Sequence, residues 1–124
     1  MTHRILAIDD DELVLLSIEE LLATEGFVVT TAPGGKAGLE AAGRATFDLV
    51  LLDLVMPGLS GFEVCKALRA MPAFRDVPIV MLTAKAAPAD REQGLAAGAT
   101  VFLPKPIHPE KLLETIRTAL RPQA

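Results

Sequence analysis

The chain has 124 residues, a formal net charge of -4 and one cysteine, Cys65. A chain of this length forms one domain with one core, so we expect a single domain over residues 1–124, with its core at about 4–120 and a short tail at 121–124. The acidic charge argues against direct binding of nucleic acid. The lone cysteine excludes an internal disulfide and a multi-cysteine metal site.

The sequence also lacks the patterns that direct a protein to a membrane or out of the cell. No apolar run approaches the length of a membrane span, and the N-terminus does not have the basic, apolar and small-residue regions of a signal peptide. A single cysteine is typical of a reducing compartment. We therefore expect a cytoplasmic protein that does not contact a membrane.

Short apolar runs alternate with helical patterns along the chain. Strands are expected at residues 4–9, 27–31, 49–52, 78–83 and 101–103. Helices are expected after the acidic run 9–12, at about 36–42, from 62 to about 71, at 88–97 and from about 109 to 120. Gly26 ends the first helix, whose apolar residues recur at helical spacing and predict a broad apolar face: Leu13, Val14, Leu16, Ile18, Leu21 and Leu22.

Five alternations of strand and helix predict an α/β fold, a doubly wound parallel sheet with right-handed crossovers and helices on both faces. Residues 49–52 are all aliphatic, as in a strand that is buried on both faces. Five units favour the flavodoxin-like (βα)5 arrangement, strand order 2-1-3-4-5, over the dinucleotide-binding order. The first and third strands are then neighbours, and ligands bind beyond their carboxyl ends.

Polar residues follow the apolar strands at that edge: Asp9 and Asp10 after the first, Asp53 after the third, Thr83 after the fourth and Lys105 after the fifth. Carboxylates that meet at adjacent strand ends repel one another unless a divalent cation joins them, and an all-oxygen site suits Mg2+. Lysine and threonine offer the charge and the donor that a phosphoryl group needs. Asp53 is then either a metal ligand alone or also a nucleophile that forms an acyl phosphate.

Each of these residues also has an ordinary structural explanation. The acidic run 9–12 would favour the start of a helix through the helix dipole. Lys105 could be a solvated loop residue, and Thr83 a strand residue satisfied by its neighbours. The combination at one edge of the sheet favours a site more than any member does. Phe102 is expected first as a core residue.

Four stretches resemble the CheY-like receiver domain of bacterial two-component response regulators, over about residues 4–120. They are Ile-Leu-Ala-Ile-Asp-Asp-Asp (5–11), Asp-Leu-Val-Leu-Leu-Asp-Leu-Val-Met-Pro-Gly-Leu-Ser-Gly (48–61), Pro-Ile-Val-Met-Leu-Thr-Ala (78–84) and Phe-Leu-Pro-Lys-Pro (102–106). Each stretch alone is weak, but all four in this order and at these spacings are specific.

The resemblance implies that Asp53 is the phosphoacceptor. It also implies that Mg2+ is held by Asp53, by Asp10 directly, by Asp9 largely through water, and by the backbone carbonyl of Val55. Lys105 would pair with the phosphoryl oxygens.

Further contacts and a switch follow from the same resemblance. Thr83 would hydrogen-bond the phosphoryl group, and the amides of Val55 and Ala84 would add donors. The Lys105-Pro106 peptide bond is expected to be cis. Phosphorylation would draw Thr83 inward and Phe102 after it, which would change the face formed by the fourth helix, fifth strand and fifth helix.

The implied activity is a phosphorelay step in signal transduction. A histidine kinase or a histidine phosphotransfer protein would present phosphohistidine, and the chain would catalyse only its own Mg2+-dependent phosphorylation and dephosphorylation. The aspartyl phosphate would act on a downstream output protein or on an output domain outside this chain. A dimer that forms on phosphorylation is a further expected partner.

Three other classes of protein fit parts of the pattern. A haloacid-dehalogenase-like phosphatase needs a second aspartate two residues after the nucleophile as general acid, and Val55 stands there. A flavodoxin-like cofactor binder would use backbone amides for phosphate, not three carboxylates. A receiver-like interaction module that is never phosphorylated would be indicated by loss of Asp53, Thr83 or Lys105, all of which are present.

Overall fold

The computed structural model describes residues 2–106 and 108–121, and it contains one five-stranded parallel sheet. The strands are β1 (Arg4–Ile8), β2 (Val28–Ala32), β3 (Leu49–Leu52), β4 (Ile79–Thr83) and β5 (Val101–Pro104). The helices are α1 (Glu12–Thr24), α2 (Gly35–Arg44), α3 (Gly61–Ala70), the short 3-10 helix η1 (Pro72–Phe74), α4 (Pro88–Ala97) and α5 (Pro109–Leu120). The strand order is β2-β1-β3-β4-β5, so the predicted flavodoxin-like order is confirmed.

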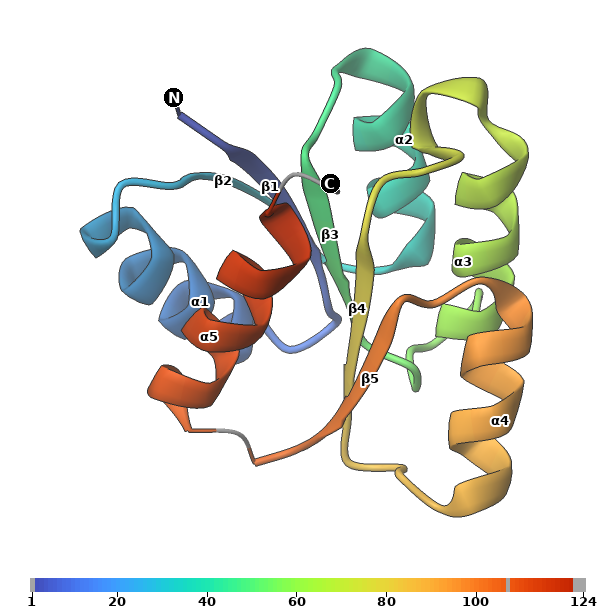
Figure 1. Ribbon diagram of the computed structural model, residues 1–124. Helices are drawn as coiled ribbons and strands as arrows, with labels where there is room; N and C mark the ends of the chain where they lie inside the picture. The colour runs from blue at the N-terminus through green and yellow to red at the C-terminus, as the bar shows by residue number, and fades with distance from the viewer. Residues whose placement is uncertain (1, 107, 122–124) are drawn as a thin grey trace.

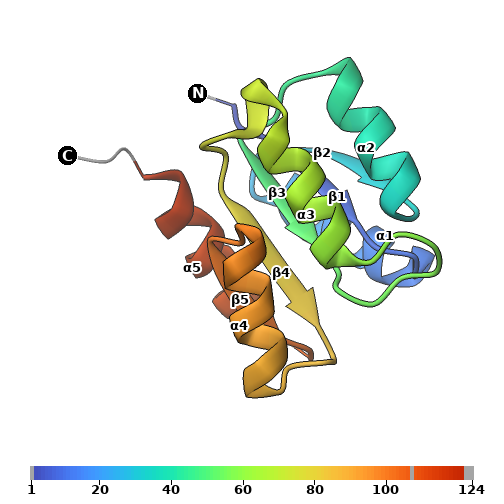
Figure 2. The same ribbon diagram turned by 90° about the vertical axis from the view of Figure 1, so that its right-hand side faces the viewer.

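Helices cover both faces of the sheet (Figures 1 and 2). α1 and α5 lie on one face, and α2, α3 and α4 lie on the other. The side chains of β3 alternate between the two layers, with Val50 and Leu52 in one core and Leu49 and Leu51 in the other. A strand with apolar packing on both faces has no solvent side, which is why the run is aliphatic throughout.

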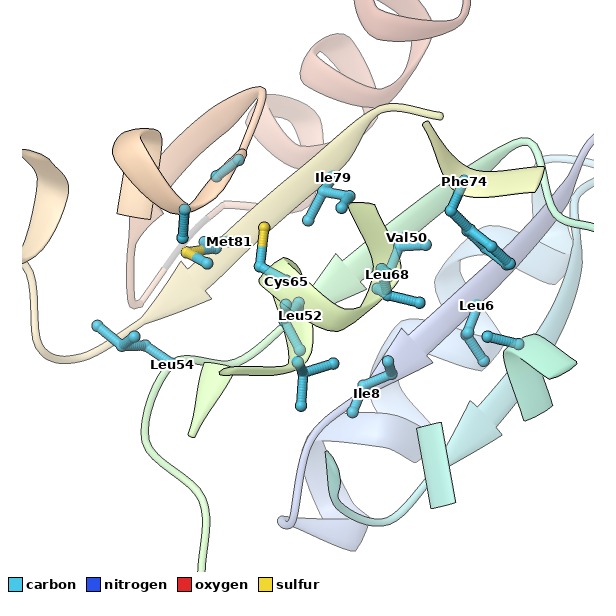
Figure 3. Packing of buried hydrophobic residues seen from close by; sticks show 14 of the residues in the cluster. Leu6, Ile8, Val50, Leu52, Leu54, Cys65, Leu68, Phe74, Ile79 and Met81 are labelled. Carbon is cyan, nitrogen blue, oxygen red and sulfur yellow. The ribbon is translucent and has the colours of Figure 1, made fainter. Parts of the chain in front are cut away.

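The larger core lies under α2, α3 and α4. Figure 3 shows Leu68 and Cys65 of α3 packing toward Ile79 and Met81 of β4, with Phe74 of η1 at one end. Cys65 is fully buried, and this burial raises the pKa of its thiol. Cys65 is therefore a small apolar residue of the core.

The predicted apolar face of α1 is wrong in part. Leu15, Ile18 and Leu22 pack on the sheet at spacings of three and four residues, whereas Leu13 is 75% exposed and Leu16 is 50% exposed. Both exposed leucines lie away from this stripe, because a helix turns by 100° per residue. The spacing of the apolar residues alone did not distinguish these two exposed leucines from the leucines that pack in the core.

Most predicted element ends differ from the observed ones by one or two residues. Phe27 was expected to open a strand, but its amide donates to the carbonyl of Leu22 and completes the end of α1, so β2 begins at Val28. The predicted tail extends past the described residues at 122–124. Within the part of the chain that is described, no helix is long and apolar enough to cross a membrane.

Candidate functional site

The sheet register places the two central aspartates side by side. Ile8 of β1 pairs with Leu52 of β3, and Asp9 and Asp53 are the next residues in each chain segment. The amide of Asp53 donates to the carbonyl of Ile8 at 2.9 Å, which continues the ladder by one residue. Both carboxylates are thus at the carboxyl ends of adjacent strands, at the edge predicted to carry the site.

Asp10 completes a group of three acids. One carboxylate oxygen from each of Asp9, Asp10 and Asp53 lies within 4.8 Å of the others. Asp9 and Asp53 are buried, while Asp10 is exposed. The donors are all hard oxygens, and the exposed side leaves room for water ligands, which is the environment that Mg2+ prefers.

The two oxygens of Asp9 already have protein partners. Oδ1 accepts a hydrogen bond from the amide of Asp11 at 2.9 Å, and Oδ2 accepts one from the Lys105 ammonium at 2.7 Å. Asp10 has no such restraint among the contacts of the described residues and faces solvent. This arrangement supports the expectation that Asp10 approaches a metal directly and that Asp9 acts largely through water.

Asp53 lies in an electrostatically unfavourable place for a carboxylate. Burial raises its pKa, the charges of Asp9 and Asp10 raise it further, and the Lys105 ammonium and the Leu54 amide act in the opposite direction. Its Oδ1 accepts from the Leu54 amide at 2.9 Å and lies 3.6 Å from the Lys105 Nζ. A further cation would stabilise the ionised form, which is the form that can act as a nucleophile.

Thr83 and Lys105 reach the same edge from the next two strands. The amide of Lys105 donates to the Thr83 carbonyl at 2.8 Å, and the Lys105-Pro106 peptide bond is cis, as predicted. The Thr83 side chain is buried, and its hydroxyl accepts from the amide of Lys85 at 3.0 Å. The predicted hydrogen bond from Thr83 to a phosphoryl group stays a prediction.

The remaining predicted site residues are one buried aromatic residue and two exposed small residues. Phe102 is a buried core residue, in line with its first expected position, and α4 places Gly94 against its ring. The side chain of Val55 is exposed beside the site, and Ala84 is exposed at the end of β4. The metal-binding and phosphoryl-binding positions of their backbone groups stay predictions, as does the motion of Phe102.

Sequence reasoning missed two features that position Asp53. One is the Leu54 amide, whose direction depends on a turn geometry that has no side-chain signal. The other is Gly61, where an added Cβ would lie 2.4 Å from the Asp53 carbonyl oxygen, so only glycine lets α3 begin this close to the strand end. A glycine directly after the helix cap Ser60 is the signal that could have indicated this close approach.

The comparisons with known proteins agree with this geometry. The family model for the response regulator receiver domain matches residues 5–117. The chain is 37% identical to the chemotaxis protein CheY4 of Vibrio cholerae, whose structure superposes with a TM-score of 0.93 and covers 97% of this chain and 100% of that one. This chain therefore belongs to the receiver domain family of response regulators.

Two further relatives show how receivers occur within other proteins. The chain is 41% identical over 121 residues to the response regulator PleD of Caulobacter vibrioides, covering 98% of this chain and 27% of PleD. It thus spans about a quarter of that relative. It is 32% identical to the receiver domain of the sensor histidine kinase PA1611 of Pseudomonas aeruginosa, with a TM-score of 0.89 over 97% and 98% of the two chains. In that structure, a magnesium ion is coordinated in the active site cleft.

Proposed function

We propose that this domain accepts a phosphoryl group on Asp53 from the phosphohistidine of a histidine kinase or a phosphotransfer protein. The observation that carries the proposal is the junction of three carboxylates and one ammonium at the ends of β1, β3 and β5. Acids alone would only bind a cation. The Lys105 ammonium, 3.6 Å from Asp53 Oδ1, adds a positive charge on the side where phosphoryl oxygens would lie.

The reaction needs a nucleophile, charge neutralisation and a leaving group. A carboxylate oxygen of Asp53 attacks phosphorus, the bond from phosphorus to the imidazole nitrogen breaks, and the imidazole leaves with the electron pair and takes up a proton. Lys105 leaves its ion pair with Asp9 in part and contacts the transferred oxygens. Dephosphorylation is a separate reaction, in which water attacks phosphorus, the bond from phosphorus to the Asp53 oxygen breaks, and inorganic phosphate leaves with the protons of the water. The domain then catalyses only its own phosphorylation and dephosphorylation.

The residues present fit Mg2+. Asp10 and Asp53 would bind it directly, the Val55 carbonyl would complete the protein ligands, and Asp9 would hold a bound water, since both of its oxygens have protein donors. When bound, the ion supplies neutralisation of the charge that develops on the phosphoryl oxygens.

A surface beside the site suits the phosphoryl donor. An apolar groove of about 520 Å³ lies between α1 and the start of α5, and Lys105 is one of its lining residues. Leu13 lies in this groove and is among the most exposed large apolar side chains. A donor protein that brings phosphohistidine to Asp53 would cover this groove.

Leu13→Ser should slow transfer from a protein donor but leave phosphorylation by acetyl phosphate unchanged. Equal slowing of both reactions would contradict this position for the donor.

The output of the domain is proposed on the same basis. Phosphorylation would favour a second conformation of the Thr83 segment and of the face formed by α4, β5 and α5. That face would then bind a downstream protein, an output domain or a second copy of the chain. We propose the cytoplasm as the compartment of this exchange.

The experiment is intact-mass measurement after incubation with acetyl phosphate, with and without Mg2+. The wild-type chain should gain one phosphoryl group only with Mg2+, and hydroxylamine should remove it, because it cleaves acyl phosphates. Asp53→Asn should gain nothing. If the wild type gains no mass and also fails to bind Mg2+ with beryllofluoride, the proposal is wrong, and the interaction module that is never phosphorylated is the better explanation.

A further inference from the structure

A chain of contacts connects Thr83 to the first turn of α4. The Thr83 hydroxyl accepts a hydrogen bond from the amide of Lys85 at 3.0 Å. The side chain of the same residue, Lys85, extends along the loop, and its Nζ lies 3.6 Å from Oδ1 of Asp90 in α4. The backbone of Lys85 thus holds the hydroxyl of Thr83, and its side chain holds the helix.

Asp90 is not an ordinary surface acid. Its side chain is only 12% exposed, and Lys85 is its one ion-pair partner among the described residues. Its amide donates to the Ala87 carbonyl at 3.0 Å, in the first turn of the helix. Asp90 has little access to water, but the Lys85 side chain is 62% exposed, so the contact restrains the loop about as much as a surface ion pair does.

The segment lies at the edge of the sheet that carries the candidate site. Figure 1 shows the loop between β4 and α4 on the same side as the carboxyl ends of β1 and β5. Four residues after Asp90, Gly94 packs against the Phe102 ring and the Met81 sulfur, where an added Cβ would lie 2.9 and 3.0 Å from their atoms. A movement of the first turn of α4 therefore changes contacts in the core as well as in the loop.

We propose that Lys85 and Asp90 are positioning residues, whose ion pair keeps the segment from Thr83 to α4 in the conformation of the unphosphorylated protein. The Thr83 hydroxyl accepts a hydrogen bond from the Lys85 amide in this conformation, and no hydrogen bond joins these two described residues, Thr83 and Asp53. To bind a phosphoryl group on Asp53, the hydroxyl has to move, and the Lys85 backbone moves with it against the restraint of its own side chain. This inference rests on the proposed function.

The proposal predicts that two substitutions with opposite effects on the net charge change the affinity for a phosphoryl mimic in the same direction. Lys85→Met makes the protein more negative, and Asp90→Asn makes it less negative, so a general effect of charge would change the affinity for an anion in opposite directions. Loss of a restraint changes both in the same direction. Each variant should therefore favour the conformation that binds the phosphoryl group, whatever its net charge.

The test is a titration with beryllofluoride, a phosphoryl mimic, at saturating Mg2+. Lys85→Met and Asp90→Asn should each bind it about two- to fivefold more tightly than wild type, which is the size that one partly exposed ion pair can produce. The double variant should bind no more tightly than the single ones, because the restraint is already absent. Lys85→Arg should keep the wild-type affinity, since the pair can form again.

Two controls separate this effect from others. Lys111→Met removes a lysine from an exposed 3.9 Å pair with Glu114 on α5 and measures the effect of the lost charge alone. The affinity for Mg2+ alone, which should stay within about twofold of wild type, shows that the acids are intact, because a merely structural defect would weaken it.

Each other outcome is decisive. Weaker binding by Lys85→Met would show that its ammonium contacts the phosphoryl group and would overturn the proposal. Unchanged affinity in both variants would overturn it too and would leave the proposed function standing. No binding by the wild type would refute the proposed function, and this inference with it.

Discussion

Replacing Lys105 by methionine removes the one cation that, within residues 2–106 and 108–121, forms ion pairs with the acids of the site, while keeping most of the volume of the side chain. Lys105 Nζ is 2.7 Å from Asp9 Oδ2, and the two side chains are 23% and 5% exposed. Breaking a fully buried pair costs about 3–5 kcal/mol, and breaking an exposed pair costs at most about 1 kcal/mol. The partial exposure of Lys105 places the expected loss of unfolding free energy at about 2–3 kcal/mol in metal-free buffer.

The assay is thermal and urea unfolding followed by far-UV circular dichroism, because the chain has no tryptophan or tyrosine to report by fluorescence. For a chain of 124 residues, the loss corresponds to a fall of about 8–12 °C in Tm. Mg2+ should raise the stability of Lys105→Met more than that of wild type, since the ion no longer meets the competing ammonium. The exposed pair of Lys111 again supplies the control, and Lys111→Met should change stability by less than about 0.5 kcal/mol.

Two results would refute this reasoning. If Lys105→Met in chelator were as stable as wild type, the ion pair with Asp9 would not contribute to the folded state. If Mg2+ stabilised both proteins equally, Lys105 would not compete with the metal for the same carboxylates.

Three further predictions follow from the geometry. Asp53→Asn should be more stable than wild type in chelator at neutral pH. The pKa of Asp53 is raised in the folded state by burial and by the charge of Asp9, so ionisation of this carboxyl removes stability from wild type as pH rises above about 4, and the difference between the two proteins should vanish in acid. Unfolding scans across pH check this, and a difference that does not depend on pH would contradict it. Gly61→Ala should lower the free energy of unfolding by about 1–3 kcal/mol and slow phosphorylation by acetyl phosphate, since its Cβ meets the Asp53 backbone. Gly43→Ala, which has open space in α2, should instead raise the free energy of unfolding by about 0.5–1 kcal/mol. Equal effects of the two substitutions in urea unfolding would exclude the close approach at Gly61. Arg69→Met should lower the free energy of unfolding by about 2–4 kcal/mol in the same assay, because the Arg69 guanidinium donates to the carbonyls of Phe74, Val77 and Gly98. Arg69→Lys should recover only part of this loss. Full recovery would mean that the positive charge, and not the planar guanidinium with its several donors, stabilises these carbonyls.

The sheet and the positions of the polar residues could be predicted from the sequence because they depend on short continuous apolar runs and on the residues that follow them. The run at residues 49–52 has no solvent side, and that fixes it as the central strand. Asp9 and Asp53 follow aligned strands, so their proximity needed only the strand order. The register then placed both carboxylates at one edge.

Features that depend on the orientation of a helix or on the path of a loop could not be predicted in the same way. The exposure of Leu13 and Leu16 depends on which side of α1 meets the sheet, and seven large apolar residues in one helix left that open. The pairing of Lys85 with Asp90 depends on the path of a loop with no periodicity. The occupation of both Asp9 oxygens by Asp11 and Lys105 likewise appears only when the segments after β1 and β5 are both in place.

The most direct test of the central claim is to locate the phosphoryl group. The chain is phosphorylated with acetyl phosphate and Mg2+, reduced with borohydride, which converts an aspartyl phosphate to homoserine, and digested for peptide mass spectrometry. We expect homoserine at position 53 alone, and none when Mg2+ is withheld. Homoserine at Asp9 or Asp10, or a phosphoryl group on any other side chain, would contradict the assignment of Asp53 as the phosphoacceptor.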